Sequence, residues 1–481
     1  MYDDSYILEH WQDYDRPMTL EFTGGETAEL FTRQIADSFS GVLRYNFLYD
    51  QENIGFVTAS IGGRIFSDTL WPRDAGVFLR ELVCWGYLGR ACLMAHRLTL
   101  LCGVNDIGFC SYPEKMWPGK VEAGYELDGT AAILVGFGML CRKLQLLGDE
   151  PACAFAERMI KDQEKPNSSL RYLLHCIDQN GLISGSGEFG GGLGVAGRFY
   201  NVVANALCRN ALIVWARLLK MQPQSSRQEL GILCEQCAKS FEEGVTRSFL
   251  NPEGFWFCLD SNSLKPDPVV LNLRGNQGFS GVNGVLSMAC DSDGLDLCNW
   301  PWREPARRTF FHLLEQPYRK KQYDRYGIYV QFQQVAQGLL SSPSYGQGYA
   351  LQAALLMGEK EIAGNLLRYL VSATHLPPKE YILTRGDGEE NWFYERLLLP
   401  EYFTLPLEKQ DVDGEGCGAL NLVNVAEPLK AARLMAGVAG TGEALSLHPC
   451  LPAGITGCFI RNLGELSGNT FQYRDLHIQE E

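Results

Sequence analysis

Helical segments that alternate with long, chemically varied loops are the feature that most constrains how this chain can fold. After Pro72, apolar residues recur on one helical face as far as Ala91, and the helix after Tyr200 shows the same periodicity. Similar patterns occupy residues 127–147, 150–163, 226–247, 280–292, 302–314, 344–357, 359–373 and 418–437. Roughly a dozen helices, with every second loop long and no short sequence repeat, predict an all-α closed ring of helical hairpins rather than an open solenoid.

The two ends of the chain have a different pattern. Residues 18–30 and 54–66 are rich in β-branched and aromatic residues with glycine between them, which predicts short strands. The tail beyond the last helical pattern also turns to short β-like segments. We therefore expect a β-containing N-terminal segment (1–66) packed on the ring, the ring itself (67–440) and a small β-like cap (441–481).

Charge and composition narrow the range of partners. The chain carries 42 basic and 57 acidic residues, a net charge of −15, which disfavours nucleic acid and anionic membranes because phosphate groups attract clustered Lys and Arg. A neutral ligand fits better.

The N-terminus lacks a basic stretch followed by an apolar one, and no run of roughly 18 apolar residues stands out, so we expect a cytoplasmic protein without a membrane span.

The sixteen cysteines indicate a reducing compartment rather than a metal site. Most lie inside apolar helical stretches, as free cysteines do when they act as small core residues. Cys234 and Cys237 have metal-like spacing, yet no second pair completes four ligands. We expect no metal and no cofactor, and the seven histidines form no recognisable catalytic constellation, so carboxylates are the candidates for chemistry.

The first candidate site motif is Trp71-Pro72-Arg73-Asp74, at the entrance to an apolar helix. Trp71 offers a flat apolar face to a pyranose ring, and Arg73 and Asp74 offer donors and acceptors to its hydroxyls. The alternative is purely structural, because an acidic residue in the first turn of a helix is favoured by the helix dipole and can pair with the arginine.

A second motif lies before the helix at 127–147 and contains Glu126 and Asp128. Asp128 could simply cap that helix. Because Trp117 lies upstream, the segment also fits a wall that binds sugar hydroxyls.

The third motif surrounds Glu188 with glycines and one aromatic residue. Small neighbours allow a substrate to approach closely, and poor solvation raises the pKa of the carboxyl toward that of a general acid. A surface loop carrying an exposed glutamate is the alternative. The functional interpretation is favoured because a helix with a polar opening at Tyr200 and Asn201 follows directly.

The fourth motif contains Glu390, Trp392 and Glu395, with Glu415 further along the chain. Inverting glycoside hydrolysis needs a protonated acid and an ionised carboxylate about 6.5–9.5 Å apart, with a water beside the base. Glu188 and Glu390 lie on different hairpins, as such a pair requires, and Glu395 and Glu415 are alternative bases.

These motifs resemble those of a group of carbohydrate-active enzymes. The loops at Trp71-Pro72-Arg73-Asp74 and Asp128-Gly129 resemble those of glycoside hydrolase family 15, the glucoamylase-like enzymes. The Glu188 and Glu390-Asn391-Trp392 loops are similar to the acid and base loops of families 63 and 37 and of the amylo-1,6-glucosidase group. The resemblance follows the motif order over residues 55 to 435.

The resemblance implies an (α/α)6 toroid and an exo-acting, inverting glycoside hydrolase that releases a terminal neutral sugar from an oligosaccharide or glycoside. Glu188 would be the general acid and Glu390 the general base. The contacts to the terminal sugar would come from Arg73, Asp74 and Asp128, with further contacts from Trp71, Trp117, Glu126, Tyr200 and Trp392.

Two other functions stay open. A polysaccharide lyase or unsaturated-uronide hydrolase can use the same ring, although its acidic substrate would need more basic groups than Arg73 and Arg198. A non-enzymatic helical protein that binds carbohydrate or acts as a scaffold is the other. The sequence leaves the sugar, its linkage and the oligomeric state open.

Overall fold

The computed structural model describes most of the chain, with gaps. The described residues are 4–61, 69–118, 120–121, 126–184, 199–256, 258–266, 302–315, 320, 323–324, 339–373, 402–406, 413–415, 420–438, 449–467 and 470–479.

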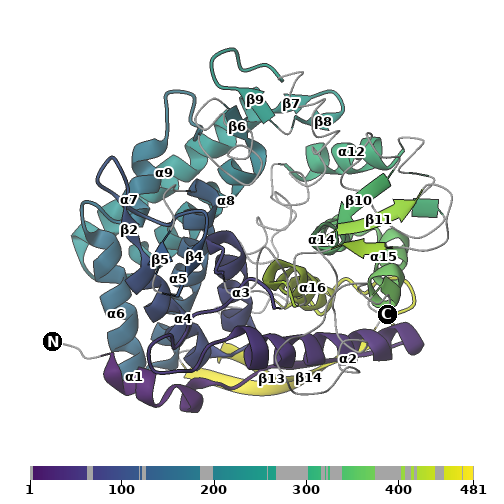
Figure 1. Ribbon diagram of the computed structural model, residues 1–481, viewed down its shortest axis with the longest axis horizontal. Coiled ribbons are helices and arrows are strands. Elements are labelled where there is room, and N and C mark those ends of the chain that lie inside the picture. Colours follow the sequence, from purple (N-terminus) through teal and green to yellow (C-terminus); the bar gives the residue numbers. More distant parts are fainter. Residues whose placement is uncertain are drawn as a thin grey trace.

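An inner and an outer layer of helices make up the all-α toroid, which confirms the predicted fold class (Figure 1). The described inner helices are α3 (Pro72–Cys84), α5 (Leu127–Leu147), α8 (Val202–Lys220), α14 (Ser344–Met357) and α16 (Leu422–Met435). The outer helices are α2 (Glu26–Gly41), α4 (Leu88–Leu101), α6 (Glu150–Glu164), α9 (Ser225–Ser248), α12 (Arg303–Leu314) and α15 (Lys360–Ala373). Neighbouring inner helices pack in the order α14, α16, α3, α5 and α8.

Most of the predicted helices are present within a few residues of their expected ends. The segment 280–292 lies outside the described residues. A short helix, α7 (Ser169–Cys176), was not predicted; it begins at Ser168, whose side chain accepts a hydrogen bond from the backbone N–H of Arg171.

Small residues bring α3 and α5 together. A Cβ on Gly76 would lie 2.4 Å from the carbonyl carbon of Ala132, and one on Gly129 would lie 2.9 Å from the Cβ of Pro72. These contacts place the N-terminal turns of the two helices at the same level. The residues at the start of α3 therefore lie beside those at the start of α5.

The single helix predicted from Pro72 to Ala91 is wrong, because this part of the chain forms two helices. Helix α3 ends at Cys84, and Gly86 takes a left-handed conformation with φ +82° before α4 begins at Leu88. The carboxylate of Asp15 then accepts hydrogen bonds from the backbone N–H groups of Gly89 and Arg90 at the start of α4.

The strand expected at 18–30 is shorter than predicted. Strand β1 (Thr19–Thr23) ends before Gly24 and Gly25, and α2 follows with Phe31, Ile35 and Phe39 on its buried face. At 54–66, the described residues make isolated bridges, including Phe47 with Val57.

The two ends of the chain share one antiparallel sheet. Strand β1 pairs with β13 (Gly457–Ser467), which pairs with β14 (Thr470–Gln479), and Figure 1 shows these strands beside α2. The register sets Leu20 opposite Ile460 and Phe22 opposite Cys458, all four buried. The division into segments at 66 and 440 stays a prediction.

Helices α5 and α8 are long and apolar enough to cross a membrane by length and composition, although the sequence analysis noted no such run. In the most apolar 18-residue stretch of each helix, 78% of α5 and 83% of α8 are buried inside the protein. Their hydrophobic surface is therefore used inside the ring.

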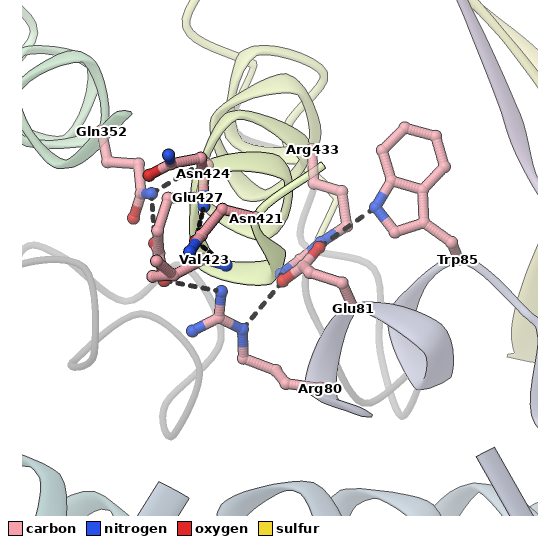
Figure 2. A network of polar contacts seen from close by, with 9 residues as sticks. All are labelled: Arg80, Glu81, Trp85, Gln352, Asn421, Val423, Asn424, Glu427 and Arg433. Carbon is pink, nitrogen blue, oxygen red and sulfur yellow. Dashed lines mark hydrogen bonds and ion pairs between the residues drawn. The ribbon is translucent and has the colours of Figure 1, made fainter. Parts of the chain in front are cut away.

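A buried network of charges joins α3, α16 and α14 (Figure 2). Arg433 of α16 donates two hydrogen bonds to Glu81 of α3, from Nη2 to Oε1 at 2.7 Å and from Nε to Oε2 at 2.8 Å. Arg80 donates to Glu81 at 2.8 Å and to Glu427 of α16 at 3.4 Å. Gln352 of α14 donates to the Glu427 carboxylate at 2.6 Å.

The side chains in this network are almost inaccessible to water, with at most 3% exposure for each of the five residues. Two arginines and two glutamates balance in charge. Buried ions are tolerated only when paired and hydrogen-bonded, so the relative positions of these three helices are tightly constrained.

Arg433→Met should therefore strongly destabilise the protein, because it leaves the Glu81 carboxylate buried without its bidentate partner. We expect a loss of about 3–5 kcal/mol in the free energy of unfolding, measured by urea denaturation. Arg461→Met is the matched control, since Arg461 makes an exposed ion pair with Glu21, and it should change little. Equal effects of the two substitutions would contradict the structural role of the buried network.

Candidate functional site

The candidate site lies at the N-terminal ends of α3 and α5. Trp71 precedes the first turn of α3 in an extended conformation, and Pro72 occupies that turn, where its missing N–H costs nothing. Asp128 lies in the first turn of α5, one residue from Gly129, which packs against Pro72. The sequence-predicted residues Arg73, Asp74 and Asp128 are thereby brought together.

One arginine serves several buried carboxyls in this cluster. The Arg73 guanidinium lies 3.1 Å from the Asp74 carboxylate, and Asp74 and Asp128 are only 6% and 3% exposed. Burial raises the pKa of both aspartates, and the positive charge of Arg73 opposes that shift in each. The charge of Asp128 raises the pKa of Asp74 further. A single cation therefore stabilises more negative charge than it can fully neutralise.

Glu126 supplies a proton to the same cluster. Burial, followed by the negative charge of Asp128, raises the pKa of Glu126 to about 9 despite the opposing effect of Arg73. A hydrogen bond from Glu126 favours the ionised form of Asp128. At neutral pH the Glu126 carboxyl is therefore protonated and can act as a hydrogen-bond donor beside an acceptor.

Two tryptophans predicted to contact sugar lie near one cation. The ammonium of Lys115 lies 5.8 Å from the ring centre of Trp71 and 5.7 Å from that of Trp117. Paired backbone hydrogen bonds between Leu70 and Met116 hold the two segments together. Strand β4 (Met116–Trp117), which pairs with β5 (Lys120–Val121), therefore runs beside the entrance to α3.

Two residues that were not predicted, Tyr349 of α14 and Glu427 of α16, interact electrostatically with this cluster. Burial and then the Glu427 carboxylate raise the pKa of Tyr349 of α14, and Arg73 opposes this effect. The charge of Glu427 also raises the pKa of Asp74. An acidic residue inside the apolar run of α16 was the available signal for Glu427. Tyr349 lies beyond a glycine-rich segment and carried no comparable signal.

Tyr200 has a structural role that the sequence did not indicate. It lies in β6 (Phe199–Asn201), is 2% exposed, and its hydroxyl donates to Asp178 and accepts a hydrogen bond from Asn180 at 3.0 Å. Burial, followed by the hydrogen bond to Asp178, raises the pKa of Tyr200. Its predicted contact with substrate stays a prediction.

The described residues on either side of the segment 185–198, which contains Glu188, lie close together. Ser184 bridges Tyr200, and Asn205 of α8 exchanges two hydrogen bonds with the backbone of Ile183, at 2.8 and 3.1 Å. Asn201 caps α8 by accepting from the N–H groups of Val203 and Ala204. Both ends of the segment are thereby fixed at the N-terminal end of an inner helix.

Four other predicted site residues have no described position. Glu188, Glu390, Trp392 and Glu395 lie outside the described residues. Glu415 ends β12 (Asp413–Glu415), where its backbone is opposite Tyr402 of β11 (Tyr402–Pro406). Strand β11 also pairs with β10 (Leu339–Pro343), which leads directly into α14.

The described parts of the chain contain no group of three or more His, Cys, Asp or Glu side chains that could hold a metal ion. Cys234 of α9 is buried, and burial raises the pKa of its thiol to about 12, so it is protonated at neutral pH. Protonated thiols are poor metal ligands.

Comparisons with known proteins support the fold. No family model matches the chain, and no curated protein matches it in sequence. A glycosidase variant in complex with glucose is similar in structure, with TM-score 0.54, 12% identity, and coverage of 85% of this chain and 97% of the other. A family 78 rhamnosidase of Bacillus sp. GL1 has TM-score 0.56 and 11% identity, covering 92% of this chain and 39% of that protein. A novel alpha-amylase from Clostridium perfringens has TM-score 0.50 and 10% identity, covering 83% and 98%. At these identities the similarity establishes the fold alone.

Glu126→Gln should make the protein less sensitive to alkaline pH. Folding of the wild type takes up a proton between the ordinary pKa of 4.5 and the folded-state pKa of about 9, so wild-type stability falls as pH rises through that window. Glutamine removes this dependence. We expect the stability of the variant relative to wild type to grow by up to about 1.4 kcal/mol per pH unit between pH 5 and 8, measured by urea denaturation.

Glu229→Gln, a substitution on the exposed side of α9, is the control and should run parallel to the wild type over the same range. If Glu126→Gln also runs parallel to the wild type, the carboxyl of Glu126 is ionised in the folded protein.

Proposed function

We propose that this protein is an exo-acting, inverting glycoside hydrolase that releases a terminal neutral sugar from an oligosaccharide or glycoside. The observation that supports this most directly is the group formed by the buried Asp74 and Asp128 with the partly buried Arg73 and Glu126, near Trp71 and Trp117. It places hydrogen-bond donors and acceptors next to aromatic faces. Sugar hydroxyls need the first, and the C–H faces of a pyranose ring pack on the second.

In the proposed mechanism, Arg73 donates to hydroxyls of the terminal sugar, and Asp74 and Asp128 accept from them. Glu126, protonated, supplies a further donor. Glu188 protonates the departing oxygen, while Glu390 removes a proton from the attacking water. The bond from the anomeric carbon to the leaving oxygen breaks as the bond to water forms, and the configuration at that carbon inverts.

A second candidate is suggested by Lys115. Its ammonium lies within 6 Å of both tryptophan ring centres, at 5.8 and 5.7 Å, and supplies a basic group besides Arg73. An acidic sugar could pair with it, as an unsaturated-uronide hydrolase or a polysaccharide lyase would require.

Hydrolysis should be tested on disaccharides, aryl glycosides and uronides of differing sugar and linkage. We expect turnover of a neutral substrate, and proton NMR should detect the anomer of inverted configuration first. First release of the retained anomer would contradict the inverting mechanism. Turnover confined to uronides would favour the second candidate, and binding without turnover would favour a carbohydrate-binding protein.

Glu188→Gln should lower kcat on an unactivated substrate by about 100-fold or more while leaving substrate affinity largely intact, because only the proton donor is lost. Steady-state kinetics and calorimetric binding measure the two effects. Glu253→Gln, at an exposed position in the turn after β7 (Leu250–Asn251), is the matched control and should retain wild-type kinetics. Full activity of Glu188→Gln would remove Glu188 from the role of general acid.

A further inference from the structure

A cavity lies between the inner helix α5 and the helices α4, α6 and α7. Its volume is about 180 Å³. An engineered apolar cavity of about 150 Å³ in another protein holds benzene, so this space is large enough for a six-membered ring.

Gln163 gives this cavity an unused hydrogen-bond donor. The side chain is 8% exposed and lines the cavity from α6. Its carboxamide oxygen accepts the backbone N–H of Leu170 at 3.0 Å, which fixes the orientation of the group, and no described residue accepts from its NH₂. This NH₂ is not fully enclosed by protein, so water or a ligand in the cavity can accept from it.

Other polar groups complete the lining. Asp162 offers carboxylate oxygens, and Lys165 and Arg158 hold that carboxylate at 2.7 and 3.2 Å. The Ser169 hydroxyl shares a hydrogen bond with the thiol of Cys102 at 3.7 Å and, being both donor and acceptor, can also bind a ligand oxygen. Because Asp162 is already paired with cations, the cavity favours an uncharged ligand.

Phe137 of α5 and Met159 of α6 supply the apolar part of the lining. A neutral ring that carries hydroxyls on its edge and C–H groups on its faces would match both kinds of surface. The ion pair of Lys165 with Asp162 is partly exposed, with side-chain exposures of 62% and 26%, so its opening costs little.

We infer that this cavity binds a neutral six-membered polyol, a hexopyranose or a cyclitol, at a site separate from the proposed catalytic cluster. The Gln163 NH₂ donates to a ligand oxygen, the Asp162 carboxylate accepts from a hydroxyl, and the ring packs on Phe137 and Met159. The site does not depend on the protein being a hydrolase, because none of its residues belongs to the proposed machinery.

Saturation-transfer NMR with glucose, mannose, galactose, rhamnose and myo-inositol tests for binding, with a dissociation constant of about 1 mM expected for ligands of this size. Cys110, which lines the cavity, reports where the ligand binds. A bound ligand should slow the modification of Cys110 by methyl methanethiosulfonate at least threefold, followed by peptide mass spectrometry. Protection by the sugars alone or by myo-inositol alone identifies which source of polyol the site accepts.

Two variants separate this site from binding elsewhere. Gln163→Glu keeps an acceptor for the Leu170 N–H but removes the NH₂, and Thr99→Met fills the cavity from α4. In both variants, at least ten times more ligand should be needed to protect Cys110 to the same extent. Gln145→Glu makes the same chemical change in α5, where the partner is Gln222, and should leave protection unchanged.

The inference is overturned if no compound protects Cys110 in the wild type, which would mean that the cavity holds only water. It is also overturned if protection persists unchanged in Gln163→Glu and Thr99→Met. Saturation transfer without Cys110 protection would place binding outside this cavity and would leave the proposed hydrolase function untouched. Loss of hydrolysis in the Glu188 variant has no bearing on Cys110 protection, so the two proposals fail separately.

Discussion

The bidentate ion pair between Glu81 and Arg433 is the interaction on which the arrangement of the inner helices depends most. It joins the first inner helix to the last one across 352 positions of sequence, in a place that water does not reach. Arg80, Glu427 and Gln352 extend the pair to α14. Apolar packing tolerates small shifts between helices, whereas paired buried charges do not, because a lost contact leaves a desolvated ion. The network therefore fixes α3, whose N-terminal end carries Arg73 and Asp74, relative to α14 and α16.

Burial has a different consequence for the carboxyl groups at the N-terminal ends of α3 and α5, where the candidate site lies. The positive charge of Arg73 lowers the pKa of each of Asp74, Glu126 and Asp128, whereas burial raises the pKa of all three acids. The proton shared by Glu126 and Asp128 lets a buried group of carboxyls exist without a matching number of cations. Such a group can both donate to and accept from hydroxyls. The contrast with the charge-balanced network around Glu81 separates a structural cluster from one suited to a ligand.

The sequence predicted the ring and the meeting of Arg73, Asp74 and Asp128, because helical periodicity and motifs at helix entrances are local signals. The long-range partners could not be predicted in the same way. Arg433 is an ordinary basic residue in its own helix, and only the folded chain shows that Glu81 lies opposite it. Tyr200 is close to Glu188 in the sequence, whereas Asp178, to which its hydroxyl donates, is 22 positions away and is brought to it only by folding. The roles of Glu188, Glu390, Trp392 and Glu395 stay predictions.

The sheet shared by β1 and β13 affects how the protein is made. Glu21 and Arg461, which face each other across it, are 440 positions apart. At a synthesis rate of about 5–20 residues per second, β1 emerges from the ribosome roughly 20–90 s before its partner strand exists. During that time its edge has no native strand to pair with. The amphipathic α2 follows β1 directly and packs against it, so it can cover part of β1 before β13 has been synthesised.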